Sequence, residues 1–197
     1  MKFFVGSPPE MAAFDARRDG WTLVPEPGKA AFMGIGLAVA VGVGLAILGV
    51  LFLCGTNIDA LTDVRHIPYG IGIILALIPL HEFLHLICLP GLGFDGHTWV
   101  GICPAFGGIC VLYDAILQRN RFVLVAACPA VVLTGLPLLA AIVLHGIPMT
   151  LVAVCYLNAM LSAVDVAAIV IVLCQVPGDA QLRNKGFRTY WRSSRTR

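Results

Sequence analysis

The apolar stretch LIPLHEFLHLICLP, from Leu77 to Pro90, contains two histidines and a glutamate. His81 and His85 are four residues apart, so on a helix they lie on one face and can bind the same metal ion. Glu82 stands between them and completes the pattern HExxH. In this pattern the two imidazoles bind zinc, and the glutamate acts as general base on a water molecule. The residue types and their spacing therefore indicate a zinc-dependent hydrolase.

The alternative interpretation is a chance match between ordinary core histidines. With five His and three Glu in 197 residues, the pattern arises by chance on the order of once in a thousand such chains. A charged side chain at the centre of a bilayer costs a few kcal/mol, so Glu and His within a membrane segment are candidate functional residues. The apolar surroundings therefore favour a functional site.

Long apolar segments must hold these residues in place. The chain is 59% hydrophobic and 12% charged, whereas a soluble domain is about half apolar and about a quarter charged. A membrane span needs about 20 residues, and the backbone of a span in lipid must be helical. Four segments are long enough: Ala30–Cys54, Ile67–Pro90, Phe122–Leu144 and Met149–Cys174. The sequence therefore predicts an all-α integral membrane protein with about four transmembrane helices.

The distribution of positive charge predicts how these spans are oriented. Of the 13 Lys and Arg residues, Arg65 alone falls in a loop on the opposite side. The others precede the first span, lie between the second and third, or follow the fourth. The positive-inside rule assigns that side to the cytoplasm. We therefore expect a multi-pass protein of a prokaryotic cell membrane with both termini in the cytoplasm.

The same pattern divides the chain into three parts. Residues 1–29 form a cytoplasmic N-terminal segment, residues 30–174 a four-span membrane core, and residues 175–197 a basic cytoplasmic tail. A short basic tail next to a span favours anchoring at the lipid surface over nucleic-acid binding. We therefore expect the lipid bilayer as a partner and no nucleic acid.

Two short apolar segments lie between the second and third spans. Thr98–Cys103 and Ile109–Tyr113 flank the turn sequence PAFGG, which predicts a β-hairpin-like insertion. The pattern leaves open whether this hairpin enters the membrane or lies at its surface. Cys103 and Cys110 could meet across the hairpin, but the seven scattered cysteines are more typical of small apolar side chains.

Asp165 is the candidate for a third metal ligand. Catalytic zinc usually has three protein ligands and a water molecule, and Asp165 is the remaining acid within the predicted spans. Phe83 lies 16 residues after Ile67, and Asp165 lies 16 residues after Met149. At 1.5 Å per residue both positions are about 24 Å along spans that run in the same direction. An interhelical hydrogen bond is the alternative role, but an unpaired carboxylate at this depth favours a ligand.

Two further polar residues share the helix face of Asp165. Asn158 and Ser162 precede it by seven and three residues, which gives one polar stripe on an apolar helix. They either form interhelical hydrogen bonds or act around the site, by orienting Asp165 or donating to a substrate carbonyl.

These motifs make the chain similar to a known group of proteins. HEFLH on a membrane helix, with an Asp on a later helix, resembles the site-2 protease class of intramembrane metalloproteases. A closer resemblance is to a family of small putative zincin membrane peptidases known as a domain of unknown function. Its members share GWTLVPEP-like sequence before the first span, HExxH, and then N-x-x-x-S-x-x-D with a later Pro and Trp. These last residues are here Asn158, Ser162, Asp165, Pro177 and Trp191.

The residues and the resemblance together predict a zinc metallopeptidase that acts on a membrane protein or peptide. His81, His85 and Asp165 would bind Zn²⁺, and Glu82 would be the catalytic base. The chain departs from site-2 proteases because Asp165 stands in AVDVA, without the Asn-Pro or Asp-Gly context. The alternative is a catalytically inactive metal-binding scaffold or binding module.

Overall fold

The structure is a computed structural model that describes residues 1–7, 15–16, 19–25, 27–55, 67–104, 108–145, 147–186 and 188–194, without the side chains of residues 29, 30, 32 and 33. Three of the sequence predictions concern residues outside these ranges: Arg65, Glu26 of GWTLVPEP and the centre of the PAFGG turn. The chain divides into two compact units. One comprises Met1–Gly28, Glu82–Ala126 and Ala168–Arg197, and the other comprises Lys29–His81 and Ala127–Ala167.

Helices form most of the described chain. They are α1 (Lys29–Leu53), α2 (Ile67–Cys88), α3 (Arg119–Pro129), α4 (Leu136–Leu144), α5 (Met149–Leu161) and α6 (Ala163–Gln175). A 3-10 turn, Pro90–Gly93, follows α2, and a π-helical segment, Ala130–Gly135, joins α3 to α4.

Three helical stretches among the described residues are long and apolar enough to cross a membrane: Gly34–Leu53, Ile67–Cys88 and Arg119–Leu144. The fourth predicted span is not straight, because α5 and α6 are bent by 47° relative to each other. Ser162 lies at the bend with a ψ of −5°, and its backbone N–H donates to the Asn158 carbonyl. The pair counts as one further candidate span if it crosses as a unit. The depth comparison for Asp165 assumed a straight helix. The position of Asp165 relative to HExxH therefore has to be taken from its side-chain contacts.

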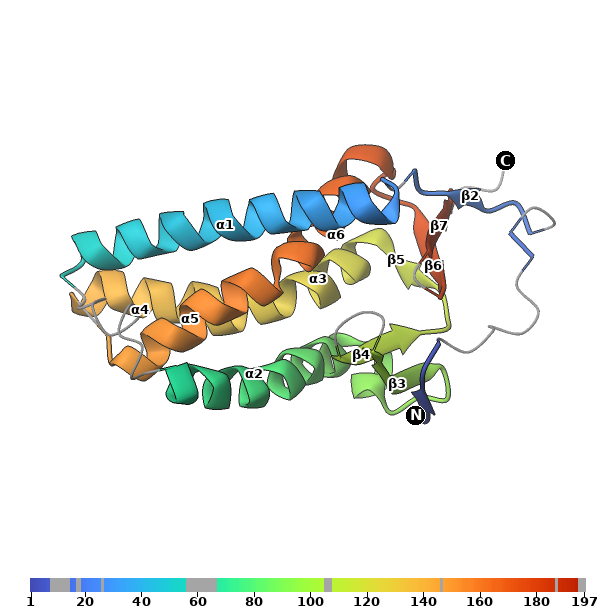
Figure 1. Cartoon of the computed structure of the whole chain (residues 1–197). Helices are drawn as coiled ribbons and strands as arrows, with labels where there is room; N and C mark the ends of the chain where they lie inside the picture. Colours follow the sequence, from blue (N-terminus) through green and yellow to red (C-terminus); the bar gives the residue numbers. More distant parts are fainter. Residues whose placement is uncertain are drawn as a thin grey trace. The chain divides into compact units, whose positions relative to one another are not determined.

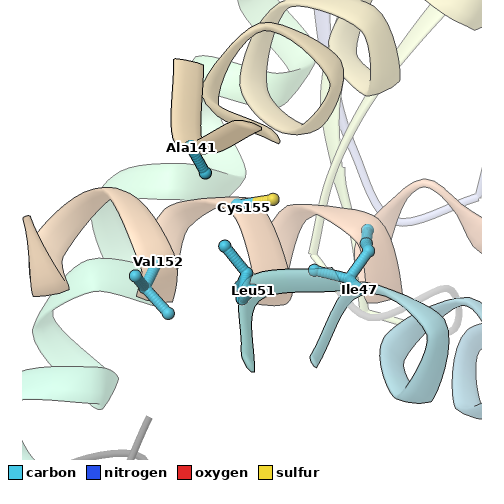
Figure 2. Packing of buried hydrophobic residues seen from close by; sticks show 6 residues of the cluster. Ile47, Leu51, Ala141, Val152 and Cys155 are labelled. Atoms are coloured by element: carbon cyan, nitrogen blue, oxygen red, sulfur yellow. The ribbon is translucent and has the colours of Figure 1, made fainter. Parts of the chain in front are cut away.

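In the unit that contains α1, α4 and α5, these helices pack side by side (Figure 1). Ile47 and Leu51 of α1 lie against Val152 and Cys155 of α5, with Ala141 of α4 completing the cluster (Figure 2). All five side chains are buried. Interlocking apolar side chains of this kind stabilise the helix contacts through close packing.

The prediction of an all-α fold is incomplete, because the other unit contains two sheets. The first has the order β1-β3-β4, formed by Lys2–Val5, Thr98–Cys103 and Gly108–Tyr113. Strands β3 and β4 are antiparallel and form the predicted hairpin, while β1 adds in parallel to β3. Gly101 permits this addition, because a Cβ there would lie 2.4 Å from the ring of Phe4.

The second sheet has the order β2-β7-β6-β5 and includes much of the basic tail. Its strands are β2 (Thr22–Leu23), β5 (Leu117–Gln118), β6 (Gln181–Lys185) and β7 (Arg188–Arg192). Gly186, with a φ of +59°, follows β6 in the turn toward β7. These strands are not predictable from the sequence, since they are short and lack the alternation of apolar and polar residues that marks a half-buried strand.

Candidate metal centre

His81, near the C-terminal end of α2, has a polar partner on each ring nitrogen. Its side chain is buried, and the residue is 5% exposed. Nδ1 lies 2.9 Å from Oδ1 of Asn158 on α5. Nε2 lies 3.1 Å from Oδ2 of Asp165 on α6. Two of the predicted site motifs, HExxH and the polar stripe, therefore meet at this imidazole.

The amide group of Asn158 determines which nitrogen of His81 carries a proton. Its Nδ2 donates to the Pro129 carbonyl at 2.9 Å, and lies 3.0 Å from Thr134 Oγ1 and 3.3 Å from Ser162 Oγ. Because three acceptors surround Nδ2, Oδ1 must be the atom that faces His81. A carbonyl oxygen only accepts, so Nδ1–H of His81 donates to it. In the neutral imidazole, Nε2 is then left with its lone pair directed at Asp165.

This assignment leaves two acceptors facing each other. A neutral Nε2 and a carboxylate oxygen 3.1 Å apart repel one another unless a cation lies with them. That cation is either a proton, which makes His81 an imidazolium paired with Asp165, or a metal ion that uses both lone pairs. Histidine ligands of metal ions commonly donate their other ring N–H to a carbonyl or carboxylate, and His81 has this arrangement through Asn158.

His85 has an equivalent arrangement, with a backbone carbonyl as its partner. Its Nδ1 lies 2.8 Å from the carbonyl oxygen of Val125 on α3, so Nδ1–H donates and Nε2 carries the lone pair. The Val125 carbonyl would ordinarily accept from the backbone N–H four residues later. That residue is Pro129, which has no N–H. Pro129 therefore leaves this carbonyl free to orient His85.

The donor set matches the requirements of a zinc site. His81, His85 and Asp165 each offer one atom that could bind a metal ion. Two imidazole nitrogens and a carboxylate oxygen are ligands that catalytic zinc uses, with a fourth position open to water. The arrangement can hold a divalent cation.

Glu82 contacts the hairpin. Its Oε2 accepts a hydrogen bond of 3.1 Å from the backbone N–H of Val111 in β4. Strand β4 is at an edge of the β1-β3-β4 sheet. The carboxylate that follows His81 in the sequence is thus held by an edge strand.

A second group of hydrogen bonds anchors this hairpin near the end of α2. The hydroxyl groups of Tyr113 and Thr98 donate to the Asp95 carboxylate at 2.8 and 2.9 Å. Burial, followed by the bond to Asp95, raises the pKa of Tyr113 to about 12. Burial opposes ionisation of Asp95, but the donors around it hold the pKa of this carboxyl below its usual value. Tyr113 also packs on Leu86 of α2, so the strand bonded to Glu82 is also fixed at its C-terminal end.

Several positioning groups were missed at the level of the sequence. Asn158 and Ser162 were predicted either to form interhelical hydrogen bonds or to act around the site; Asn158 bonds to His81 of α2, and Ser162 and Thr134 lie at its amide nitrogen. Thr134 lies in the π-helical segment, a type of distortion that is frequent at functional sites. The sequence signal for this distorted segment was Pro129, a proline within an apolar helix.

The other described histidines lie elsewhere in the chain: His97 in the turn before β3, and His145 at the end of α4.

A helical chain with an HExxH helix and a carboxylate in contact with its first histidine defines a candidate class of metal-binding hydrolases. The family model described as putative zincin peptidase matches residues 74–181, more than half of the chain. The chain belongs to this family, which confirms the closer of the two resemblances found in the sequence, the one to the zincin peptidases. The match spans His81, Glu82, His85 and Asp165. No curated protein and no solved structure matches the chain. The family supports zinc-dependent metallopeptidase chemistry.

Proposed function

We propose that the protein is a membrane-embedded zinc metallopeptidase that hydrolyses peptide bonds in or near the bilayer. The observation that carries this proposal is the pair of His81 Nε2 and Asp165 Oδ2, 3.1 Å apart, with the opposite nitrogen of His81 bonded to Asn158. His85, one turn further along α2, presents its Nε2 in the same way because Val125 binds its Nδ1. The membership of the zincin peptidase family supports zinc as the ion.

In this proposal His81, His85 and Asp165 are the ligands. These residues would hold zinc, which would supply a Lewis acid able to polarise a carbonyl group and to make water a stronger acid. Glu82 takes a proton from the attacking water and later gives it to the leaving amine. The Val111 N–H holds the Glu82 carboxylate in one orientation. This division of roles resembles that of site-2 proteases.

The hairpin offers a way to bind substrate. Strand β4 is at the edge of its sheet and bonds to Glu82. A peptide that adds to an edge strand is held extended by main-chain hydrogen bonds. A transmembrane substrate must unwind locally before its peptide bonds become accessible, and addition to β4 would stabilise the unwound form next to the base. The substrate is then a membrane protein or a peptide released from one.

Placement in the bilayer is supported by the lengths of the apolar helices and by their surfaces. Large apolar side chains of α1, including Leu37, Leu45 and Phe52, are exposed, which suits contact with lipid. The charge distribution supports cytoplasmic termini. Reporter fusions after Asp179 and near Asp59 test this orientation, because they should report opposite sides of the membrane.

The first prediction concerns the metal in the purified protein. The chain should sediment with membranes, be released by detergent, and carry about one zinc per chain, because the three ligands form a single site. Metal analysis after mild extraction measures this ratio. A ratio near zero that added zinc does not restore would exclude the enzymatic proposal.

Pro129 provides a second prediction. Pro129→Ala restores a backbone N–H that competes with His85 for the Val125 carbonyl. Zinc affinity should fall by about 10- to 100-fold, the loss typical of partners that orient metal ligands. Competition with a zinc indicator measures the affinity. Pro137→Ala, which removes the proline at the start of α4, is the matched control and should bind zinc as the wild type does. Equal affinities for the two variants would show that Pro129 does not position His85.

A catalytically inactive metal-binding scaffold or binding module is the alternative function. The same three ligands would then hold the ion for structure alone, and Glu82 would have no chemical role. The consequences of replacing Glu82 distinguish the two functions.

A further inference from the structure

Two cysteines outside the metal centre lie in contact across the hairpin. The Cys110 thiol on β4 donates toward Cys103 Sγ on β3, with 2.9 Å between the sulfurs. Both cysteines are free thiols. In the strand register, Cys103 pairs with Gly108 and Cys110 with Gly101, so the two are diagonal neighbours on one face of the sheet. Gly108 has no side chain and no atom lies within 4 Å of where its Cβ would be, which leaves space beside Cys103, whereas the ring of Phe4 covers Gly101 beside Cys110.

The surroundings of the two thiols differ. Cys103 is 1% exposed, whereas Cys110 is partly exposed. Burial, followed by the hydrogen bond to Cys103, raises the pKa of Cys110 to about 12. Cys110 is therefore the sulfur that an external reagent reaches, and only a small fraction of it is thiolate at neutral pH. A pair of this kind oxidises slowly, since the thiolate is the reactive form.

We propose that Cys103 and Cys110 form a reversible intrachain disulfide that closes the end of the hairpin. The oxidant is a low-molecular-weight disulfide. The Cys110 thiolate attacks one sulfur of the oxidant, forms a mixed disulfide and releases one small thiol. The Cys103 thiolate then attacks Cys110 Sγ and releases the second small thiol. The two cysteines together lose two protons and two electrons, and the sulfurs of the oxidant gain them.

The bridge is coupled to Glu82 through the next residue in β4. The peptide that joins Cys110 to Val111 carries the N–H that donates to Glu82. Diagonal residues in a sheet have Cα atoms about 7–8 Å apart, and a disulfide usually requires about 4.4–6.8 Å. Closing the bridge therefore draws Cys110 toward β3. Because Glu82 is not part of that sheet, this movement weakens the bond between Val111 and Glu82. The coupling to activity rests on the proposed function; the disulfide does not.

The proposed topology makes the bridge a transient state. It places the hairpin on the cytoplasmic side, where thiols are normally kept reduced and disulfides are usually regulatory. The reduced pair is then the resting form, and the oxidised pair is formed under oxidising conditions.

The test equilibrates the detergent-solubilised full chain with mixtures of glutathione and glutathione disulfide, and maps disulfides by differential alkylation and mass spectrometry. The expected result is one bridge, between Cys103 and Cys110, that excess dithiol reverses. Cys103→Ser and Cys110→Ser should each abolish it. Cys174→Ser, which removes an exposed cysteine of α6, is the matched control and should leave it intact. Free thiols at both positions under all mixtures would overturn the proposal. So would a second bound metal ion that Cys103→Ser removes, because the pair would then be a metal site.

Hydrogen exchange at the Val111 amide tests the coupling separately. Exchange should become faster in the oxidised wild type and stay unchanged in Cys103→Ser under the same mixture. An oxidised protein with unchanged exchange at Val111 would overturn the coupling to Glu82. Neither readout depends on peptidase activity, so a failure of the proposed enzyme would show in the Glu82 variant and leave these measurements interpretable.

Discussion

Glu82→Gln should retain about one zinc per chain while peptide hydrolysis falls by about 100-fold or more. Glutamine preserves the size of the side chain and an oxygen that can accept from Val111. It cannot take a proton from water, so the loss is confined to acid–base chemistry. Membrane proteomes of cells with wild-type and variant protein identify substrates, as fragments formed only by the wild type. The rate on such a substrate in detergent then measures the loss.

Glu10→Gln is the control for this experiment, because it makes the same chemical change far from HExxH in the sequence. It should match the wild type in both zinc content and fragment pattern. If Glu82→Gln and Glu10→Gln give identical proteomes, Glu82 has no catalytic role and the metal-binding scaffold is favoured. If Glu82→Gln loses zinc, Glu82 is a ligand and the assignment of the base is wrong.

Asp165→Asn should lose both zinc and activity. The amide has nearly the shape of the carboxylate but no negative charge, so the site loses its anionic ligand. The drop in zinc affinity should exceed the loss of about 10- to 100-fold that is typical for groups that only orient a ligand. Asn158→Ala removes such a group, the partner of His81 Nδ1, and should therefore bind zinc better than Asp165→Asn.

Asp179→Asn, in the turn before β6, is the matched control and should keep its zinc. Competition with a chelator of known affinity ranks the three variants without a known substrate. Wild-type affinity in Asp165→Asn would remove this residue from the metal site. The contact with His81 would then be an ion pair between an imidazolium and a carboxylate.

The part of the site that lies on one helix was predictable from the sequence. HExxH needs only the helical period, which places His81 and His85 on one face whatever surrounds them. The apolar helices were predictable for a related reason, because their length and hydropathy are properties of contiguous residues. The hairpin of β3 and β4 was predictable because its strands are close in sequence and joined by turn residues.

The tertiary structure decided which atoms orient the ligands. Asn158 lies 77 positions from His81 in sequence. Its hydrogen bond to His81 depends on the bend at Ser162 and on the Pro129 carbonyl and Thr134 hydroxyl, which accept from its amide nitrogen. The carbonyl that orients His85 is free because of a proline four residues later, and its use requires α3 to lie beside α2 at that turn.

The second sheet could not be predicted from the sequence, because it also depends on contacts between residues that are far apart in the chain. Its four short strands come from residues 22 to 192, and no local period marks them. The sequence by itself therefore determined the candidate metal ligands on α2, the candidate third ligand and the apolar helices, since these follow from local spacing and composition. The hydrogen bonds that select a ring nitrogen, the strand that holds Glu82 and the pairing of distant strands were decided by long-range packing alone.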